Sequence, residues 1–208
     1  GTVSIERGRD WGDLGPIPAG IAIAGDDATA ADIVTAARRA GEPIPPIRLT
    51  GGDLARTLGV AQDRIDRPGA PDATGVRLRV DVGAVLLDGR LHWFVAHLVA
   101  RRSWLRGRIV VAANAAFLGR WNIAPRAHPG DGRLDLLEAD LPLGDRFEAR
   151  RRLRSGSHLP HPGITQRRVD AAQVDLGRPM PVRLDGRPCG TARSLSIRVE
   201  ADALEVWI

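Results

Sequence analysis

The chain has 208 residues, of which 43% are hydrophobic and 26% are charged. This balance is enough to build a globular core, and it excludes a disordered tail, a collagen-like fibre and a disulfide-stapled miniprotein. The single cysteine, Cys189, allows no intramolecular disulfide and argues against a cysteine-based zinc site. No apolar stretch approaches the roughly 20 residues of a membrane-spanning helix, and residues 1–10 lack the apolar run of a signal peptide. We expect a cytoplasmic protein, with peripheral membrane contact left open.

The net charge is +5, and all 30 basic residues are arginine. An arginine-biased composition explains this, and so does an anionic partner such as a membrane surface or a phosphate group. Few aromatic residues, and no tyrosine, argue against a nucleic acid as the partner. The anionic partner is favoured by two clusters, namely Arg150, Arg151, Arg152 and Arg154, and Arg101, Arg102, Arg106 and Arg108.

Residues 1–60 alternate strand-like and helix-like segments, which indicates a small parallel α/β unit. Asp26 or Asp27 can cap the start of the first helix, and Gly41 can end it. The predicted elements are, in order, strands over Thr2–Glu6 and Gly20–Gly25 (the latter buried), a helix over Ala28–Ala40, a strand over Ile47–Thr50 and a helix from Gly51 to Leu58.

Residues 61–208 form a second, β-rich region. It opens with Gln62–Gly75, which has no periodicity and is interpreted as a linker or excursion. Apolar residues then alternate with Arg77, Arg79 and Asp81, and the turn Asp88-Gly89 leads into a second alternation from Leu91 to Val99, which predicts a hairpin. Further strands are predicted over Ile109–Ala113, Leu134–Leu137, Val169–Leu176, Pro181–Leu184, Leu195–Val199 and Leu204–Ile208, with a helix over Leu143–Leu153.

The predicted fold class is therefore α/β plus all-β. A shortened parallel α/β unit (residues 1–60) precedes an antiparallel β-sandwich or barrel domain (residues 61–208).

Three constellations can carry chemistry. The loop from Asn114 to Asp135 combines proline, glycine and Asp131, so it can wrap a hard cation or simply form a turn between strands. His158 and His161, three residues apart, suit a metal, but the flanking prolines favour structural or exposed histidines. Asp185, placed before Gly186 at a strand end, is either a turn residue or a general base at the mouth of a cleft.

As a set, these motifs resemble the diacylglycerol kinase catalytic family, the bacterial lipid kinases related to sphingosine kinases and NAD kinases. That family has a segment of the form N…GGG…APxAxxxDGxLD, then an HxxHP-like segment and a DGE turn. The matching residues here are Asn114, Gly119, Pro125, Ala127, Asp131, Gly132, Leu134, Asp135, Ser157-His158, Pro162 and Asp185-Gly186. In the first part, Ala24 to Thr29 resemble the family's GGDGT loop, and Ile47 to Arg56 resemble the second half of its PxGTxND(F/L)AR segment.

The resemblance implies transfer of the γ-phosphoryl group of ATP to a lipid hydroxyl, with Mg²⁺ as a further cofactor. Asp185 occupies the position of the family's proton acceptor. Asp131, with the main-chain carbonyls of His128 and Arg133, occupies the position of a structural Mg²⁺ site. Residues that match the family's ATP contacts are Gly25, Asp26 and Thr50, and Arg187 is a candidate phosphate contact.

Departures from the family pattern keep a second hypothesis open. Asp27 stands where the family has glycine, Arg187 replaces the acid of the DGE turn, and part of the nucleotide region has no counterpart. The alternative is a non-catalytic relative that binds a lipid or a protein partner. It predicts an apolar pocket lined by the Trp93 hairpin and the Trp121 loop, although these tryptophans can equally be core residues. A homo-oligomer in which another chain completes the nucleotide site also stays open.

Overall fold

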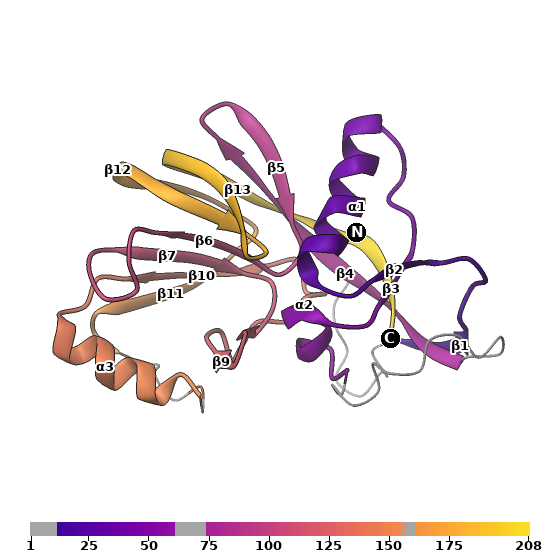
Figure 1. The fold of residues 1–208 in the computed structure, drawn as a ribbon, viewed down its shortest axis with the longest axis horizontal. Helices are drawn as coiled ribbons and strands as arrows, with labels where there is room; N and C mark the ends of the chain where they lie inside the picture. The colour runs from indigo at the N-terminus through magenta and orange to yellow at the C-terminus, as the bar shows by residue number, and fades with distance from the viewer. Residues whose placement is uncertain (1–11, 61–73, 155, 157–160) are drawn as a thin grey trace.

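The computed structural model describes residues 12–60, 74–154, 156 and 161–208. Within these ranges, eleven strands form one continuous sheet, and two short strands form a separate hairpin (Figure 1). The strand predicted over Thr2–Glu6, nearly all of the excursion from Gln62 to Gly75, and His158 lie outside the described residues.

A small parallel unit occupies one end of the molecule, on the right of Figure 1. Its strands β2 (Ala22–Ala24) and β3 (Ile47–Leu49) pair in parallel, and β3 also pairs in parallel with the end of β13 (Arg187–Trp207). The helices α1 (Asp27–Ala40) and α2 (Gly52–Thr57) follow β2 and β3. Each helix begins where its strand ends, so both helices start at one edge of this small sheet.

The ends of α1 confirm the predicted capping. The Asp26 carboxylate accepts the backbone N–H of Thr29 at 2.7 Å, and Gly41 ends the helix in the left-handed conformation at φ 71°. Ala30 and Val34 are fully buried on the face that packs on the sheet. The local sequence signals and the packing of this helix therefore agree.

An antiparallel sandwich fills the other end of the molecule. Its core is formed by large apolar side chains such as Phe94, Leu98, Leu136 and Leu195. The hydrogen-bonded order of its strands is β1-β4-β13-β12-β6-β7-β10-β11, with β5 paired to β4. The strands are β1 (Asp13–Pro16), β4 (Thr74–Leu87), β5 (Arg90–Phe94), β6 (His97–Arg101), β7 (Ile109–Ala113), β10 (Leu134–Ala139), β11 (Ile164–Val169), β12 (Ala171–Leu184) and β13.

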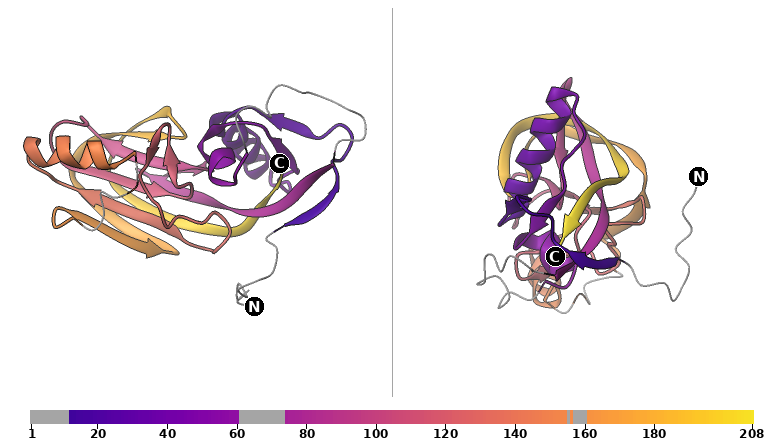
Figure 2. Two further views of the ribbon diagram at one scale, coloured as in Figure 1. Left: turned by 90° about the horizontal axis from the view of Figure 1, so that it is seen from below. Right: turned by 90° about the vertical axis from the view of Figure 1, so that its right-hand side faces the viewer.

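The two ends are joined by β4 and β13, which pair over most of their length. Both run from the sandwich into the parallel unit, as Figure 2 shows from a second side. The fold class is as predicted: a small α/β unit with an antiparallel β-sandwich. The boundary between residues 60 and 61 stays a prediction.

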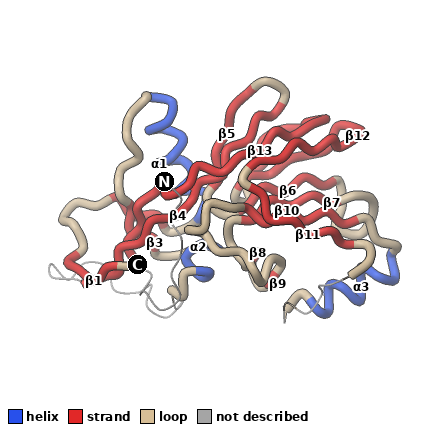
Figure 3. The backbone as a smooth tube through the Cα atoms, turned by 180° about the vertical axis from the view of Figure 1, so that it is seen from behind, coloured by secondary structure: helices blue, strands red, loops and turns tan. Residues whose placement is uncertain are grey.

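Two smaller elements stand outside the main layers. The hairpin of β8 (Phe117–Leu118) and β9 (Trp121–Asn122) lies between α2 and α3 (Figure 3). The helix α3 (Leu143–Arg152) covers the end of the sandwich that is remote from α1. Of the helices in the described residues, none has the length and apolar character needed to cross a bilayer.

The structure corrects three details of the predicted strands. The strand expected to be buried over Gly20–Gly25 is short and lies at an edge, with Ile23 55% exposed. The alternation from Leu91 to Val99 belongs to two strands, because the chain bends at Val95 and Ala96 and changes partners from β4 to β7 and β12. Asp81, expected on the polar face, is fully buried, and the backbone amides of Gly132 and of Asp202 in β13 bind its carboxylate.

Candidate active site

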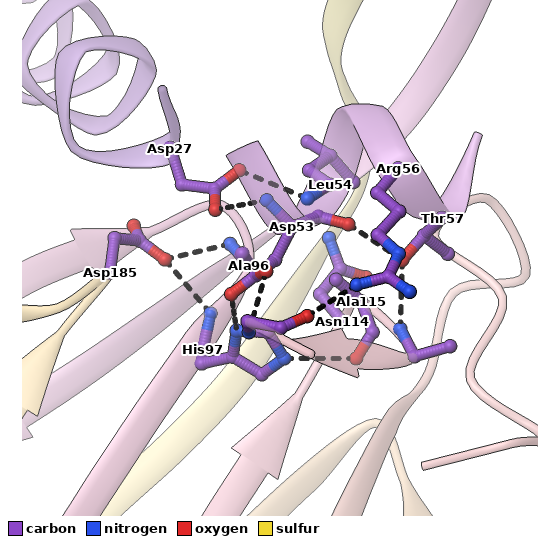
Figure 4. A network of polar contacts seen from close by, with 12 residues as sticks. Asp27, Asp53, Leu54, Arg56, Thr57, Ala96, His97, Asn114, Ala115 and Asp185 are labelled. Carbon is purple, nitrogen blue, oxygen red and sulfur yellow. Dashed lines mark hydrogen bonds and ion pairs between the residues drawn. The ribbon is translucent and has the colours of Figure 1, made fainter. Parts of the chain in front are cut away.

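Asp185 lies where the sandwich meets the parallel unit, and its carboxylate binds the bend between β5 and β6. Oδ1 accepts the backbone N–H groups of Ala96 and His97 at 2.9 and 2.8 Å (Figure 4). Oδ2 accepts the N–H of Val95 at 2.8 Å. Burial raises the pKa of Asp185 to about 7, and the nearby Asp27 carboxylate adds to the rise while the three amides oppose it. This carboxyl group therefore titrates near neutral pH.

The local sequence explains how Asp185 reaches this place. Asp185 and Gly186 have φ of 47° and 79°, and their neighbours Leu184 and Arg187 pair across β12 and β13. Two left-handed residues in succession form the tight turn that an Asp-Gly pair favours. The interpretation as a turn residue is thus confirmed, and the carboxylate held by three amides is compatible with the second interpretation, a general base.

Asp27 is a second carboxylate of the site, and it is buried. It accepts the N–H of Asp53 at 2.6 Å and that of Leu54 at 3.0 Å, so a residue of α1 caps the start of α2. The side chain is only 8% exposed, and burial raises its pKa to about 6 against the lowering effect of the two amides. The family's glycine is thus replaced here by a carboxylate that is turned onto α2.

Asp53 and His97 continue the polar network in Figure 4. The Asp53 carboxylate accepts the N–H of Gly119 at 2.8 Å, and its other oxygen lies 3.8 Å from Nδ1 of His97. Nε2 of His97 lies 3.0 Å from the carbonyl oxygen of Ala115, and a carbonyl only accepts, so we assign the ring hydrogen to Nε2. Burial lowers the pKa of His97 to about 4, so this imidazole is neutral at pH 7.

The predicted nucleotide contacts gather around the starts of α1 and α2. The loops at Gly25, before α1, and at Gly51, before α2, differ in the space around their backbones. A methyl group added at Gly25 would meet nothing within 4 Å, whereas one added at Gly51 would lie 2.3 Å from the Gly25 carbonyl oxygen. The backbone N–H and the hydroxyl of Thr50 both donate to the Ala24 carbonyl, at 2.9 and 3.3 Å. Gly25 therefore leaves room for a ligand, while both donors of Thr50 are already used.

Arg187 faces α1 from the hairpin that carries Asp185. Its guanidinium binds the Asp32 carboxylate at 2.5 Å. The pKa of Asp26 is lowered chiefly by its hydrogen bond with Thr29, and the charge of Arg187 adds a smaller effect. The structure thus brings Asp185 and Arg187 to the part of the molecule that holds Gly25, Asp26 and Thr50, and their roles toward ATP stay predictions.

The predicted cation loop lies apart from these residues. The Asp131 carboxylate forms an ion pair with Arg168 and accepts the N–H of Arg133 at 3.0 Å. A cation bound there, with the carbonyls of His128 and Arg133, would have to displace the Arg168 guanidinium. Within the described ranges, no group of three or more histidine, cysteine or acidic side chains is arranged to hold a metal ion. The residues present do not fit a bound Mg²⁺ as they stand, and we derive no step through it.

Asp81 and Asn114 connect that loop to the Asp185 site. The Asp81 carboxylate accepts the N–H of Gly132 at 2.8 Å, and its backbone N–H donates to Pro129. The Nδ2 of Asn114 donates to the carbonyl oxygens of Asp81 and Val95, both at 2.8 Å. Sequence reasoning missed Asp81 because its position in a regular alternation is typical of an exposed residue.

Comparison with known proteins now decides the family. Residues 93–208 match the model of the YegS C-terminal NAD kinase beta sandwich-like domain, which is more than half of the chain. The chain belongs to this family. The resemblance to diacylglycerol kinases that the motifs indicated is therefore confirmed. A comparison with curated proteins gives no match.

Solved structures share the fold of this YegS-type chain. Three are described as diacylglycerol kinases from Bacillus anthracis strain Sterne, two of them under a provisional name. The first is 14% identical with a TM-score of 0.65, over 89% of this chain and 76% of the other. The second is 13% identical with a TM-score of 0.66, over 88% and 76%. The third is 15% identical with a TM-score of 0.58, over 89% and 74%.

Proposed function

We propose that this protein is a lipid kinase, which transfers the γ-phosphoryl group of ATP to a lipid hydroxyl with Asp185 as the general base. The observation that carries the proposal is the Asp185 carboxylate itself. It is fixed by three backbone amides, has a pKa near 7 and stands on the hairpin that faces the start of α1. A base whose pKa lies near the working pH is the most effective at taking a hydroxyl proton.

The hydrogen bonds support Oδ2 as the oxygen that takes the proton. A carboxylate has about four lone-pair sites, two on each oxygen. Oδ1 of Asp185 uses both on Ala96 and His97, while Oδ2 uses one on Val95. Oδ2 therefore keeps a site for the hydroxyl hydrogen of a lipid. The same amides hold the carboxylate in one orientation, which lowers the entropy cost of aligning it.

Gly25 and Arg187 are the residues that fit a nucleotide phosphate best. The backbone at Gly25 is approachable, since even an added methyl group would meet nothing within 4 Å. The guanidinium of Arg187 can bind a phosphate in a bidentate manner if it exchanges its contact with Asp32. Bound ATP would supply the phosphoryl group. Asp27 does not oppose this, because its carboxylate is turned onto the amides of α2.

A second candidate is a non-catalytic relative that binds a lipid or a protein partner. It is favoured by the hydrogen bonds around the loop before α2, where polar groups already bind other groups of the protein. Asp27 already accepts the two amides at the start of α2, and both donors of Thr50 are used on Ala24. A loop in this state has fewer groups to offer to a phosphate.

Two measurements test the proposal. The first is thermal unfolding with and without ATP and Mg²⁺, where a ligand at 100 times its Kd stabilises by about 2.7 kcal/mol. The second is transfer of labelled phosphate to diacylglycerol by the wild type, Asp185→Asn and Asp88→Asn. Asp88 is a matched control, because it precedes a glycine in the same kind of turn at φ 45° and is exposed.

We expect Asp88→Asn to transfer phosphate like the wild type and Asp185→Asn to lose about 10²–10⁴-fold in rate while it stays folded by circular dichroism. Equal transfer by the wild type and a folded Asp185→Asn would overturn the assignment of the base. An absence of both transfer and an ATP-dependent shift would reject the kinase in favour of the non-catalytic relative.

A further inference from the structure

Residues of β7, β10, β11 and α3 line an apolar cavity. The helix α3 lies at the end of the sandwich that is remote from α1 (Figure 1). The volume of the cavity is about 130 Å³, and its walls include Ile109, Leu137 and Leu153. Trp104 and Trp121 meet edge to face in the wall, with ring centroids 6.0 Å apart. The alternative drawn from the sequence placed Trp93 in such a pocket, but the Trp93 indole donates to Glu200 and Trp104 takes that place.

The cavity has room for part of a hydrocarbon chain, and exposed apolar side chains lie at its edge. An apolar cavity of about 150 Å³ in a protein stays dry and takes up benzene, so this one has room for a few carbons of a chain. Two of its lining residues are exposed apolar side chains, Phe147 at 58% and Leu105 at 44%. These residues mark the opening, and they offer further apolar surface to a chain that extends out of the cavity.

A hollow lined with arginines adjoins this opening. Arg120, Arg151 and Arg154 line it together with Trp121 and Phe147, which also line the cavity. Among the described residues, none of those that line the hollow carries a carboxylate. Guanidinium groups stay charged at every physiological pH and bind phosphate and carboxylate groups well. Apolar cavity and cationic hollow therefore lie side by side and share two aromatic side chains.

Both walls are held in place without a ligand. The β8–β9 hairpin, which carries Arg120 and Trp121, is held by Asp53 and Arg56 of α2, which bind the N–H and the carbonyl of Gly119 at 2.8 and 2.6 Å. On the other side, the buried Arg146 of α3 donates to the carbonyls of Leu141, at 2.6 Å, and Trp104, at 3.2 Å. A site with fixed walls loses little entropy when it is filled.

We infer that the cavity and the arginine hollow together bind an amphiphile with one hydrocarbon chain and an anionic headgroup. The chain enters between Trp104, Trp121 and α3, and the headgroup lies on Arg120, Arg151 and Arg154. This site is distinct from the one at Asp185, where the proposed substrate offers a hydroxyl group. The inference does not depend on phosphoryl transfer and survives if the protein proves to be non-catalytic.

The test is binding of monomeric oleoyl lysophosphatidate to the full chain, measured by calorimetry and by tryptophan fluorescence. Monooleoylglycerol, which has the chain without the charge, and inorganic phosphate, which has the charge without the chain, are the comparison ligands. We expect saturable binding of lysophosphatidate, about tenfold weaker binding of monooleoylglycerol and no saturation by phosphate. Equal binding of the neutral lipid, or of phosphate alone, would overturn the inference.

Variants locate the site. Arg151→Gln with Arg154→Gln removes two exposed charges and is expected to weaken binding about tenfold without unfolding the protein. Arg39→Gln with Arg193→Gln removes two exposed arginines from α1 and β13 and should leave the affinity unchanged. Ala149→Phe fills the cavity from α3 and should abolish binding of the chain. If both arginine pairs behave alike, or a folded Ala149→Phe binds normally, the ligand lies elsewhere and the inference fails.

Discussion

Oδ2 of Asp27 lies 2.6 Å from the backbone nitrogen of Asp53, so the first turn of α1 supplies the cap of α2. Gly51, the residue just before α2, has no side chain that could cap the helix. A carboxylate from elsewhere in the chain therefore satisfies amides that the local sequence leaves without a partner. The same contact links the loop at Gly25 to the loop at Gly51, which together form the candidate nucleotide region.

Substitution of Asp27 separates its hydrogen bonds from its charge. Asp27→Asn keeps one oxygen that accepts an amide, but its NH2 group cannot accept the second. Because it also removes a buried charge whose pKa is raised to about 6, we expect its stability at pH 7 to lie within about 1 kcal/mol of the wild type. Asp27→Ala loses the cap and should unfold about 1–2 kcal/mol more easily than Asp27→Asn. Urea denaturation measures both, and equal stability of the two variants would contradict the capping role.

The stability of the protein should fall as the pH rises toward 7 because of Asp185. Its pKa is 3.8 in the unfolded chain and about 7 in the folded protein. Between these values the folded protein holds a proton that the unfolded chain has released, so this contribution is complete below pH 3.8 and is lost as the pH rises through about 7. Asp27 also lowers the stability as the pH rises, and its effect is complete by somewhat above its folded pKa of about 6.

His97 acts in the opposite direction at lower pH. Its pKa falls from 6.5 to about 4 on folding, so its contribution is present above 6.5 and lost as the pH falls toward 4. Above 6.5 only the effect of the carboxyl groups remains. We expect the melting temperature of the wild type to fall between about pH 6.5 and about pH 8, and that of Asp185→Asn to stay level. A parallel fall in both proteins would show that Asp185 is not the group responsible.

The ion pair of Asp131 and Arg168 leads to a prediction about metal. Since protein groups already satisfy this carboxylate, the melting temperature of the wild type should be the same in EDTA and in millimolar Mg²⁺. Arg168→Gln exposes the carboxylate and should create a dependence on Mg²⁺. Arg167→Gln is the matched control, because that arginine lies next along β11 and binds Glu138 instead. A wild type that EDTA destabilises would favour the structural Mg²⁺ site.

Two glycines of the nucleotide region should respond differently to alanine. Gly51→Ala places a methyl carbon 2.3 Å from the Gly25 carbonyl oxygen, so the two loops must separate, at a cost of about 1–3 kcal/mol. Gly25→Ala meets nothing within 4 Å and should leave the unfolding free energy nearly unchanged. If the proposed function holds, Gly25→Ala also weakens the ATP-dependent thermal shift. Equal unfolding free energies for the two variants would contradict the close approach of the loops.

Local patterns were sufficient for most of the fold. The caps of α1 at Asp26 and Gly41 and the turn at Asp88-Gly89 follow from short-range signals in the sequence. The order in which the strands pair in the sheet does not, because it joins strands that are far apart in the chain. Local patterns failed where a side chain found a distant partner. Asp81 alternates like an exposed residue, yet it is buried, and the loop at Gly132 and an irregular part of β13 at Asp202 supply the amides that stabilise it.

The two Asp-Gly turns show the boundary between sequence and tertiary structure. Both dipeptides have left-handed residues and close a hairpin, at Asp88 and at Asp185, because the requirement for positive φ is written in the dipeptide itself. Only the pairing of β12 with β6 brings one of these carboxylates, that of Asp185, onto three amides near Asp27. The sequence by itself therefore determined where the chain turns. The tertiary structure decided which turn holds a carboxyl group that titrates near pH 7, because that property depends on burial among residues about 90 positions away.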